Sequence, residues 1–195
     1  MTPIGVLVSG RGSNLAAILR SCQQGDLPGE VVLVASNKPG CAALDVARQA
    51  GVPVVRAFPL AEYGDLAARD GAMAEALQQA GVELVVTAGY DRILDERFVA
   101  AFEGRVLNVH PSLLPAFAGS MKAIENAFNA GVHETGVTVH LIEPNTVDGG
   151  HIIAQETVQV LAGETLESME ERIHAVEHRL LPQAIKKFIE ASRVR

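Results

Sequence analysis

The chain has little of several features that define whole classes of protein. Its 195 residues include only two cysteines, Cys22 and Cys41, which are too few for a disulfide framework and lack metal-ligand spacing. The net charge of −7 leaves no basic excess of the kind that nucleic-acid or anionic-membrane surfaces need. No charged leader precedes an apolar run, and no apolar stretch is long enough to cross a bilayer. We therefore predict a soluble cytoplasmic protein with neither nucleic acid nor membrane as a partner.

Several catalytic signatures are also missing. No serine stands in the G-x-S-x-G pattern of a nucleophile elbow, and no lysine follows the first glycine-rich turn as a Walker A loop requires. His110, His140 and Asp148 could in principle converge on a metal ion, but the chain has no C-x-x-C pair and we predict no metal site. The sequence therefore points away from covalent catalysis by a serine and from metal-assisted chemistry.

What the chain does contain is a regular alternation of short apolar runs and helical patterns. The runs predict strands at 4–9, 31–36, 52–57, 82–89 and 105–109, and helices are expected between the first four of them. Near-continuous apolar strands that alternate with helices are typical of a parallel sheet covered on both faces. The first part of the chain is therefore predicted to be an open, doubly wound (Rossmann-like) α/β sheet.

The pattern changes after residue 109. The segments 135–143 and 151–160 are expected to form an antiparallel strand pair, and a long C-terminal helix is predicted at about 165–191, kinked or split at Pro182. With 48% hydrophobic residues and no linker, the chain is predicted to form a single domain, 1–195. In such sheets, ligands bind beyond the carboxyl ends of the strands, near the point where the strand order switches.

The first candidate site is the stretch SGRGSNL, residues 9–15, which follows the first strand. Its glycines permit a tight turn, Ser13 is expected to cap the next helix, and helix amides favour an anion. The third glycine of a dinucleotide fingerprint is replaced by Leu15, and the acidic residue expected after the second strand is absent. A monophosphate cradle therefore fits better than a nicotinamide dinucleotide site, and an ordinary strand-to-helix turn is the alternative.

The second candidate is NVHPSLLP, residues 108–115, after the fifth strand. Asn108 and His110 project from the same face of an extended chain. An imidazole can donate a proton or a hydrogen bond, and an amide can stabilise an oxyanion without titrating. The alternative is a hydrogen-bonded polar pair at a strand end.

The third candidate lies between the last two predicted strands. Asp148 precedes Gly149 and Gly150, and it could orient His110, although an Asp-Gly hairpin turn is the simpler interpretation. His140 alternates with apolar residues and could support the site from behind or be an ordinary strand residue. Arg92 could contact an acidic ligand and Glu177 could bind ribose hydroxyls, but both could also be solvated surface charges.

Six stretches together, VLVSGRGSNL, VVTAGYDRIL, VLNVHPSLLP, GVTVHLIE, DGGHIIAQ and ERIHAVEHRLLP, cover nearly the whole chain in order. In this combination the chain resembles the phosphoribosylglycinamide formyltransferases, the folate-dependent enzymes of purine synthesis. The resemblance implies transfer of a formyl group from 10-formyltetrahydrofolate, a co-substrate, to the amine of glycinamide ribonucleotide, without a metal. It also implies a mononucleotide-binding half (1–104), a catalytic and folate-binding half (105–195), and a monomer or homodimer.

The resemblance also implies roles for individual residues. The catalytic residues would be Asn108, His110 and Asp148; the phosphate and ribose would be held by Gly12, Ser13, Asn14 and Glu177; folate would be bound by Arg92, Ile93, Leu94, Val147 and Asn108, with His140 behind the site. The chain departs from the family pattern at Asp91, at Leu66, and in the segment 116–128, which has no histidine and has Ala118 in place of a proline.

Other functions stay open on the sequence alone. They are 10-formyltetrahydrofolate hydrolysis, methionyl-tRNA formylation, a nicotinamide-dependent oxidoreductase and a non-catalytic nucleotide-binding module. Methionyl-tRNA formyltransferases carry an added nucleic-acid-binding domain, which we do not expect in these 195 residues, and the acidity of the chain disfavours tRNA. A binding module would have no need for Asn108, His110 and Asp148 together.

Overall fold

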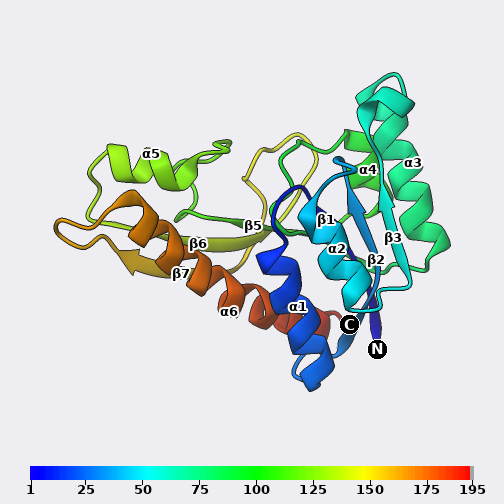
Figure 1. The fold of residues 1–195 in the computed structure, drawn as a ribbon, viewed down its shortest axis with the longest axis horizontal. Coiled ribbons are helices and arrows are strands. Elements are labelled where there is room, and N and C mark those ends of the chain that lie inside the picture. Colours follow the sequence, from blue (N-terminus) through cyan, green and yellow to red (C-terminus); the bar gives the residue numbers. More distant parts are fainter. Residues whose placement is uncertain (194–195) are drawn as a thin grey trace.

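The computed structural model, which describes residues 1–193, contains one seven-stranded sheet with helices on both faces (Figure 1). Its strands are β1 (Thr2–Val8), β2 (Gly29–Ser36), β3 (Val54–Ala57), β4 (Leu84–Thr87), β5 (Val106–His110), β6 (Glu134–Leu141) and β7 (Ile152–Gln159). Its helices are α1 (Ser13–Gln24), α2 (Ala42–Gln49), η1 (Leu60–Glu62), α3 (Leu66–Gln79), α4 (Glu96–Ala101), α5 (Ala123–Asn129) and α6 (Leu166–Ser192). The predicted α/β fold class is confirmed.

The strand order is β3-β2-β1-β4-β5-β6-β7, and the first five strands are parallel. From β1 the chain adds β2 and β3 on one side and then returns to add β4 and β5 on the other. The order therefore switches between β1 and β4. Loops at such a point diverge and leave a crevice beyond the carboxyl ends of the strands.

The two C-terminal strands form the predicted antiparallel pair, and β6 also pairs antiparallel with β5. The register places His140 opposite Asn108 and Thr138 opposite His110. Side chains that face each other across neighbouring strands lie on the same face of the sheet. The β5–β6 pairing, which the sequence did not predict, therefore brings His140 beside the two candidate catalytic residues.

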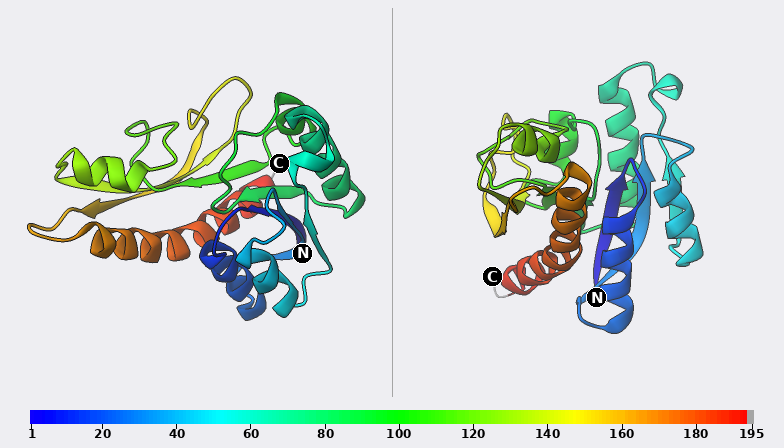
Figure 2. Two further views of the ribbon diagram at one scale, coloured as in Figure 1. Left: turned by 45° about the horizontal axis from the view of Figure 1, so that its top comes forward. Right: turned by 60° about the vertical axis from the view of Figure 1, so that its left-hand side comes forward.

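Helix α6 is one continuous helix of 27 residues that packs along β6 and β7 (Figure 2). The prediction that Pro182 splits this helix is wrong. A proline inside a helix removes one backbone hydrogen bond, which usually breaks the helix. Here Pro182 is buried together with Leu181 and Ile185, so the packing of this apolar face against the sheet compensates for the missing bond.

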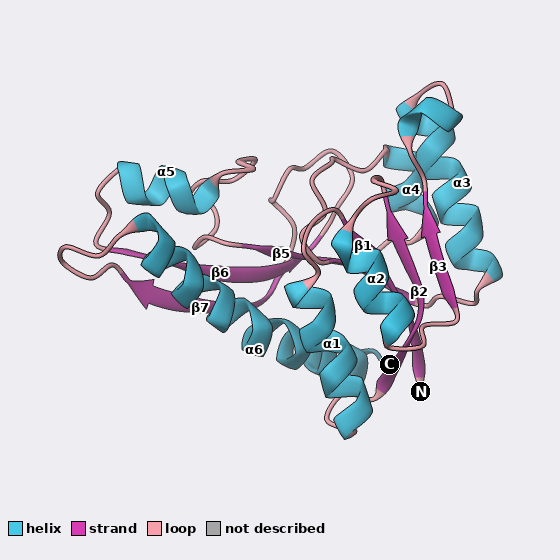
Figure 3. Cartoon of the chain, in the orientation of Figure 1, coloured by secondary structure: helices cyan, strands magenta, loops and turns pink. Residues whose placement is uncertain are grey.

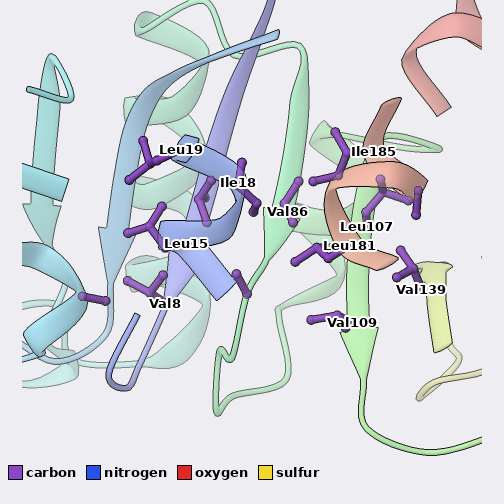
Figure 4. Close-up of a cluster of buried hydrophobic side chains, with 14 of the residues drawn as sticks. Val8, Leu15, Ile18, Leu19, Val86, Leu107, Val109, Val139, Leu181 and Ile185 are labelled. Carbon is purple, nitrogen blue, oxygen red and sulfur yellow. The ribbon is translucent and has the colours of Figure 1, made fainter. Parts of the chain in front are cut away.

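The core has two parts, one on each face of the sheet. On one face, side chains of β1, β4, β5 and β6 pack against α1 and α6, and Leu107, Val109 and Leu181 lie within this cluster (Figure 4). On the other face, Val106 packs with residues of α3 and α4. Because side chains alternate along a strand, Asn108 and His110 point to the same face as Val106. That face is left open beyond α4, and the candidate site lies there.

The short helices η1, α4 and α5 are additions to the predicted elements. They have three to seven residues, so their sequences hold too few turns for a helical period to show. Several strands are also shorter than predicted. For example, β4 covers 84–87 where 82–89 was expected. Within residues 1–193 none of the helices has the length and apolar character needed to cross a membrane.

Candidate active site

A cavity of about 930 Å³ opens at the carboxyl edge of the sheet, beside the switch between β1 and β4. The loops that follow β1, β4 and β5 meet there with the loop between β6 and β7 (Figure 3). The cavity is lined by these predicted site residues: Gly12, Ser13, Asn14, Arg92, Ile93, Leu94, Asn108, His110, Val147, Asp148 and Glu177. His140 is the one predicted residue outside the lining, since it lies buried behind Asn108.

His110 ends β5 and is 6% exposed, so its ring is held within the wall of the cavity. Its Nε2 lies 3.1 Å from the carbonyl oxygen of Phe117. A carbonyl can only accept a hydrogen bond, so Nε2 carries a proton and donates it to Phe117. Phe117 belongs to the segment after Pro115 that departs from the family pattern, and this segment therefore supplies a direct contact to His110.

Asp148 brings the loop 142–151 to the two histidines. Its Oδ2 lies 3.4 Å from His110 Nδ1, and its Oδ1 lies 3.4 Å from His140 Nε2. The backbone N–H of Gly119 donates to Oδ2 at 2.8 Å. The backbone of Asp148 has φ +53°, in the left-handed region that aspartate tolerates better than most residues. The two-residue Asp-Gly hairpin interpretation is wrong, since β6 ends at Leu141 and β7 begins at Ile152.

The environment lowers the pKa of both Asp148 and His110. Burial raises the pKa of Asp148, but the His140 imidazole and the Gly119 N–H outweigh burial and bring the pKa below its ordinary value. Burial also lowers the pKa of His110, and the Asp148 carboxylate opposes that shift only in part. At neutral pH the pair is therefore an ionised carboxylate beside a neutral imidazole, which suits a hydrogen-bond donor assisted by a proton acceptor.

His140 and Asn108 complete the polar cluster. His140 Nδ1 lies 2.9 Å from the Leu141 carbonyl oxygen, so Nδ1 carries the proton of the neutral ring. Asn108 Nδ2 lies 3.1 Å from His140 Nε2 and donates to Asp148 Oδ1 at 3.3 Å. The amide N–H groups of Asn108 therefore point towards Asp148 at the cavity wall. His140 supports this arrangement from behind.

The turn after β1 differs from the prediction in one detail. Helix α1 is capped by Gly12, with φ +87°, and Ser13 is the first helical residue and makes no capping hydrogen bond. A Cβ on Gly12 would lie 2.8 Å from the Cα of Ala43, so glycine is required here both by conformation and by close packing. Because Ser13 does not cap the helix, its side chain is available to the cavity, as are the first amides of α1.

Glu177 reaches the same end of the cavity from α6. It is 4% exposed, and its Oε2 accepts hydrogen bonds from Asn14 Nδ2 at 3.2 Å and from His174 Nδ1 at 2.7 Å. The bond to Glu177 raises the pKa of His174, against the effect of burial. Asn14, a predicted phosphate residue, is thus in direct contact with Glu177, the predicted ribose residue. The interpretation of Glu177 as a solvated surface charge is wrong.

Another part of the cavity lining carries exposed apolar side chains. Ile93 is 73% exposed, Met121 is 70% exposed and Val147 is 53% exposed, and all three side chains line the cavity. Large apolar side chains that gather around a cavity while exposed to water favour a ligand with apolar surface. The backbone of loop 142–148 adds polar groups to the same lining, so this part of the cavity combines apolar surface with hydrogen-bonding groups.

Asp91, which departs from the family pattern beside this part of the lining, is paired within the protein. Its carboxylate forms an ion pair with Lys38 and accepts a hydrogen bond from Asn37 Nδ2 at 2.8 Å. Its backbone N–H donates to Ser9 Oγ at 3.0 Å, and Ser9 Oγ donates to Asn37 Oδ1 at 2.6 Å. Burial opposes ionisation, but these partners hold the pKa of Asp91 below its ordinary value. The carboxylate and the backbone N–H of Asp91 therefore connect the loops after β1, β2 and β4.

Among residues 1–193, no group of three or more histidine, cysteine, aspartate or glutamate side chains is arranged to hold a metal ion. The sequence does contain one H-x-x-x-H pair, His174 and His178, which also suits metal ligands. Their rings are stacked with centroids 6.5 Å apart, and His174 is bonded to Glu177.

Several groups at the site were missed from the sequence. They are Arg11 and His174 in the lining, the Thr87 hydroxyl, the Phe117 carbonyl and the Gly119 N–H. Thr87 could have been found, because it lies near the carboxyl end of the predicted strand 82–89, at the edge where ligands bind. The contacts of Phe117 and Gly119 use backbone atoms, which leave no signal in residue type.

Comparison with known proteins agrees with this arrangement. Residues 3–185 match the formyl transferase family. The chain is 38% identical to phosphoribosylglycinamide formyltransferase of Haemophilus influenzae, over 97% of this chain and 88% of that protein. It is also 43% identical, over 94% of its length, to the trifunctional purine biosynthetic protein adenosine-3 of Bos taurus, of which it spans only 18%.

A solved structure is similar over the same range. The crystal structure of glycinamide ribonucleotide transformylase 1 from Symbiobacterium toebii superposes with a TM-score of 0.94 at 46% identity, covering 98% of this chain and 89% of that one. Similarity at this level extends through the sheet, the loops at its carboxyl edge and α6. The chain therefore belongs to the formyl transferase family of enzymes, in its phosphoribosylglycinamide formyltransferase branch.

Proposed function

We propose that the protein transfers the formyl group of 10-formyltetrahydrofolate to the amine of 5'-phosphoribosylglycinamide, in purine biosynthesis. The observation that carries this proposal is the position of Asn108, His110 and Asp148. They line one cavity whose lining differs from part to part: one part has helix amides and the buried Glu177, and another has exposed apolar side chains. A ribonucleotide would bind at the first part and a pterin ring at the second, so the amine and the formyl carbon would meet beside these three residues.

The phosphate would bind at the start of α1. The amides of residues 12–14 and the Ser13 hydroxyl lie there, and Arg11 adds a positive charge to the lining. The buried carboxylate of Glu177 would accept hydrogen bonds from the ribose hydroxyls. Asn14 and His174 hold that carboxylate in place.

The pterin would lie among Ile93, Leu94 and Val147. Backbone groups of the loops 89–94 and 142–148 would bind its polar edge, and Arg92 would face the acidic tail of the folate. Asn108 would reach both the folate and the reacting carbon, because it lines the same cavity as the proposed pterin residues and His110. The division into halves 1–104 and 105–195 follows the order of these parts along the chain, although both proposed binding regions draw residues from both halves.

The chemistry would be a direct attack. The amine nitrogen adds to the formyl carbon, and the carbonyl oxygen becomes an oxyanion in a tetrahedral intermediate. Asn108 Nδ2–H would donate to this oxygen, and the His110 Nε2–H would turn to it from the Phe117 carbonyl, because an oxyanion is the stronger acceptor. One such donor is typically worth about 3–4 kcal/mol of the barrier.

Proton transfer would use Asp148. The ionised carboxylate would accept the proton that the attacking amine loses and pass it through water to the departing N10 of the folate, so that the bond from carbon to N10 breaks as N10 becomes N–H. The products are the formylated ribonucleotide and tetrahydrofolate. The protein would act on small molecules in the cytoplasm, as a monomer or homodimer.

The purified protein tests this proposal when it is mixed with each substrate alone and with both. We expect tetrahydrofolate to be released only when glycinamide ribonucleotide and 10-formyltetrahydrofolate are both present, in equal amount with the formylated ribonucleotide. Release without the ribonucleotide would identify a hydrolase instead. Lack of release with both substrates, while each still binds, would indicate a non-catalytic module.

A further inference from the structure

The side chain of Thr87 lies directly beside the amide of Asn108. Thr87 ends β4, and the parallel register pairs it with Asn108 on β5. It is 3% exposed, and its Oγ1 lies 2.6 Å from Asn108 Oδ1 and 3.3 Å from the carbonyl oxygen of Leu107. A buried hydroxyl needs a hydrogen-bond partner, and here the backbone pairing of two strands fixes which partner it meets.

The other side of the amide faces hydrogen-bond acceptors. Asn108 Nδ2 is 3.1 Å from His140 Nε2 and 3.3 Å from Asp148 Oδ1. His140 Nε2 is unprotonated in the neutral ring, because Nδ1 is bonded to the Leu141 carbonyl. The oxygen end of the amide, Oδ1, faces the Thr87 hydroxyl. If Thr87 turned its single hydrogen to the Leu107 carbonyl, Oδ1 would face only lone pairs of the hydroxyl oxygen. If the amide were reversed, its oxygen would face a carboxylate and a ring lone pair.

The hydroxyl hydrogen of Thr87 can go to only one acceptor at a time. The distance of 2.6 Å to Asn108 Oδ1 is far more favourable than 3.3 Å to the Leu107 carbonyl. A donor at Oδ1 fixes the amide with its N–H groups towards the reaction centre. It also polarises the amide, which makes those N–H groups stronger donors.

We propose that Thr87 is a positioning residue for catalysis, which acts through Asn108 by holding and polarising its amide. This inference rests on the proposed role of Asn108 as an oxyanion donor. Thr87 lines the cavity, yet the inference assigns it no contact with substrate. Its contribution belongs to the formation of the oxyanion, so its loss should affect turnover rather than substrate binding.

The variant Thr87→Val tests the inference, because valine has nearly the same shape and no hydroxyl. We expect kcat to fall about 10-fold, with either KM changed less than about twofold, since one hydrogen bond that matters only in the transition state is lost. Thr87→Ser keeps the hydroxyl and should restore most of the turnover. Equal turnover in Thr87→Val and wild type would overturn the inference, as would a serine variant no better than valine, provided both have folded circular dichroism spectra.

A double-mutant cycle separates this inference from the proposed function. If Thr87 acts through Asn108, Thr87→Val should cost nothing further in an Asn108→Ala background. If the two losses multiply, Thr87 acts by another route and the inference fails, while the proposed function stands. If Asn108→Ala alone keeps normal turnover, the proposed role of Asn108 fails instead.

Thr135 provides a matched control for the removal of a buried hydroxyl. It lies on β6, is 2% exposed, and its Oγ1 has no hydrogen-bond partner within the described part of the chain. Thr135→Val makes the same chemical change in the same sheet, away from Asn108. We expect its turnover to match the wild type. A loss equal to that of Thr87→Val would show that the sheet, rather than the amide, responds to the substitution.

Discussion

Asp148 Oδ2 lies 3.4 Å from His110 Nδ1, while the other ring nitrogen of His110 is bonded to the Phe117 carbonyl. The imidazole therefore lies between a backbone carbonyl of the segment just after β5 and a carboxylate of the distant loop 142–151. In the neutral ring only Nε2 carries a proton, so the bond to the Phe117 carbonyl orients the ring in that state. The contact with Asp148 becomes an ion pair when Nδ1 takes up a proton, so Asp148 stabilises the protonated ring.

His110→Ala should abolish most of the turnover. We expect kcat to fall at least about 100-fold, because the variant removes the proposed oxyanion donor, which would act only in the transition state. Steady-state kinetics with both substrates would measure this fall, and thermal unfolding would verify the fold. His133→Ala changes an exposed histidine and should keep normal turnover. Near-normal activity of His110→Ala would show that the catalytic assignment is wrong.

Asp148→Asn should lower the pKa of His110 further. Burial already lowers this pKa, and the Asp148 carboxylate is the main influence that raises it, so an uncharged amide leaves burial less opposed. A pH titration of the imidazole followed by NMR would measure the shift, with the surface variant Asp45→Asn as a control. An unchanged or raised pKa would contradict the assigned contact. Turnover should also fall, because the proton acceptor is lost.

Ser13→Ala should weaken binding of the ribonucleotide. A hydroxyl bonded to a phosphate is worth about 1.5–3 kcal/mol, so we expect the KM for glycinamide ribonucleotide to rise roughly 10-fold or more. The KM for the folate and kcat should change little. Ser21→Ala, on the same helix but outside the cavity, should leave all three constants unchanged. An unchanged KM in Ser13→Ala would be inconsistent with a phosphate site at this helix.

Gly12→Ala should destabilise the protein much more than Gly10→Ala. At Gly12 the φ of +87° and the contact 2.8 Å from the Ala43 backbone both oppose a side chain, and at Gly10 no atom lies within 4 Å of the added Cβ. The left-handed conformation alone costs about 1–2 kcal/mol, and overpacking adds about 1–3 kcal/mol. Urea unfolding of the two variants would compare their free energies. Equal values would contradict the close packing of the first turn on α2.

His174→Gln should change how stability depends on pH. The pKa of His174 in the folded protein is raised above 6.5 by Glu177, so the folded state binds the proton more tightly than the unfolded state. The resulting stability is fully present below pH 6.5 and is lost as pH rises through the folded pKa. Wild type should therefore lose its advantage over the variant as pH rises. Parallel curves of unfolding free energy against pH would exclude this ion pair.

Much of the fold could be predicted because it depends on periodic patterns. The alternation of apolar strands with helices determines a parallel sheet, and residues placed just after its strands must gather at one edge. Asn108 and His110 share a face because two residues separate them on a strand. The short helices α4 and α5 lack enough turns to show a period, and the packing of Pro182 within α6 depends on neighbours from distant parts of the chain.

The sequence by itself determined the chemical groups of the site and their order along the sheet edge. Only the tertiary structure decided how those groups are held. The β5–β6 register places His140 behind Asn108, the loop 142–151 brings Asp148 to His110, and backbone atoms of Phe117 and Gly119 close the cluster. No local sequence pattern predicts these contacts, because they depend on how separate segments pack together. The contacts of Phe117 and Gly119 also use backbone atoms, which every residue possesses. Residue type can therefore predict which side chains react, whereas the packed chain decides their orientation and their charge.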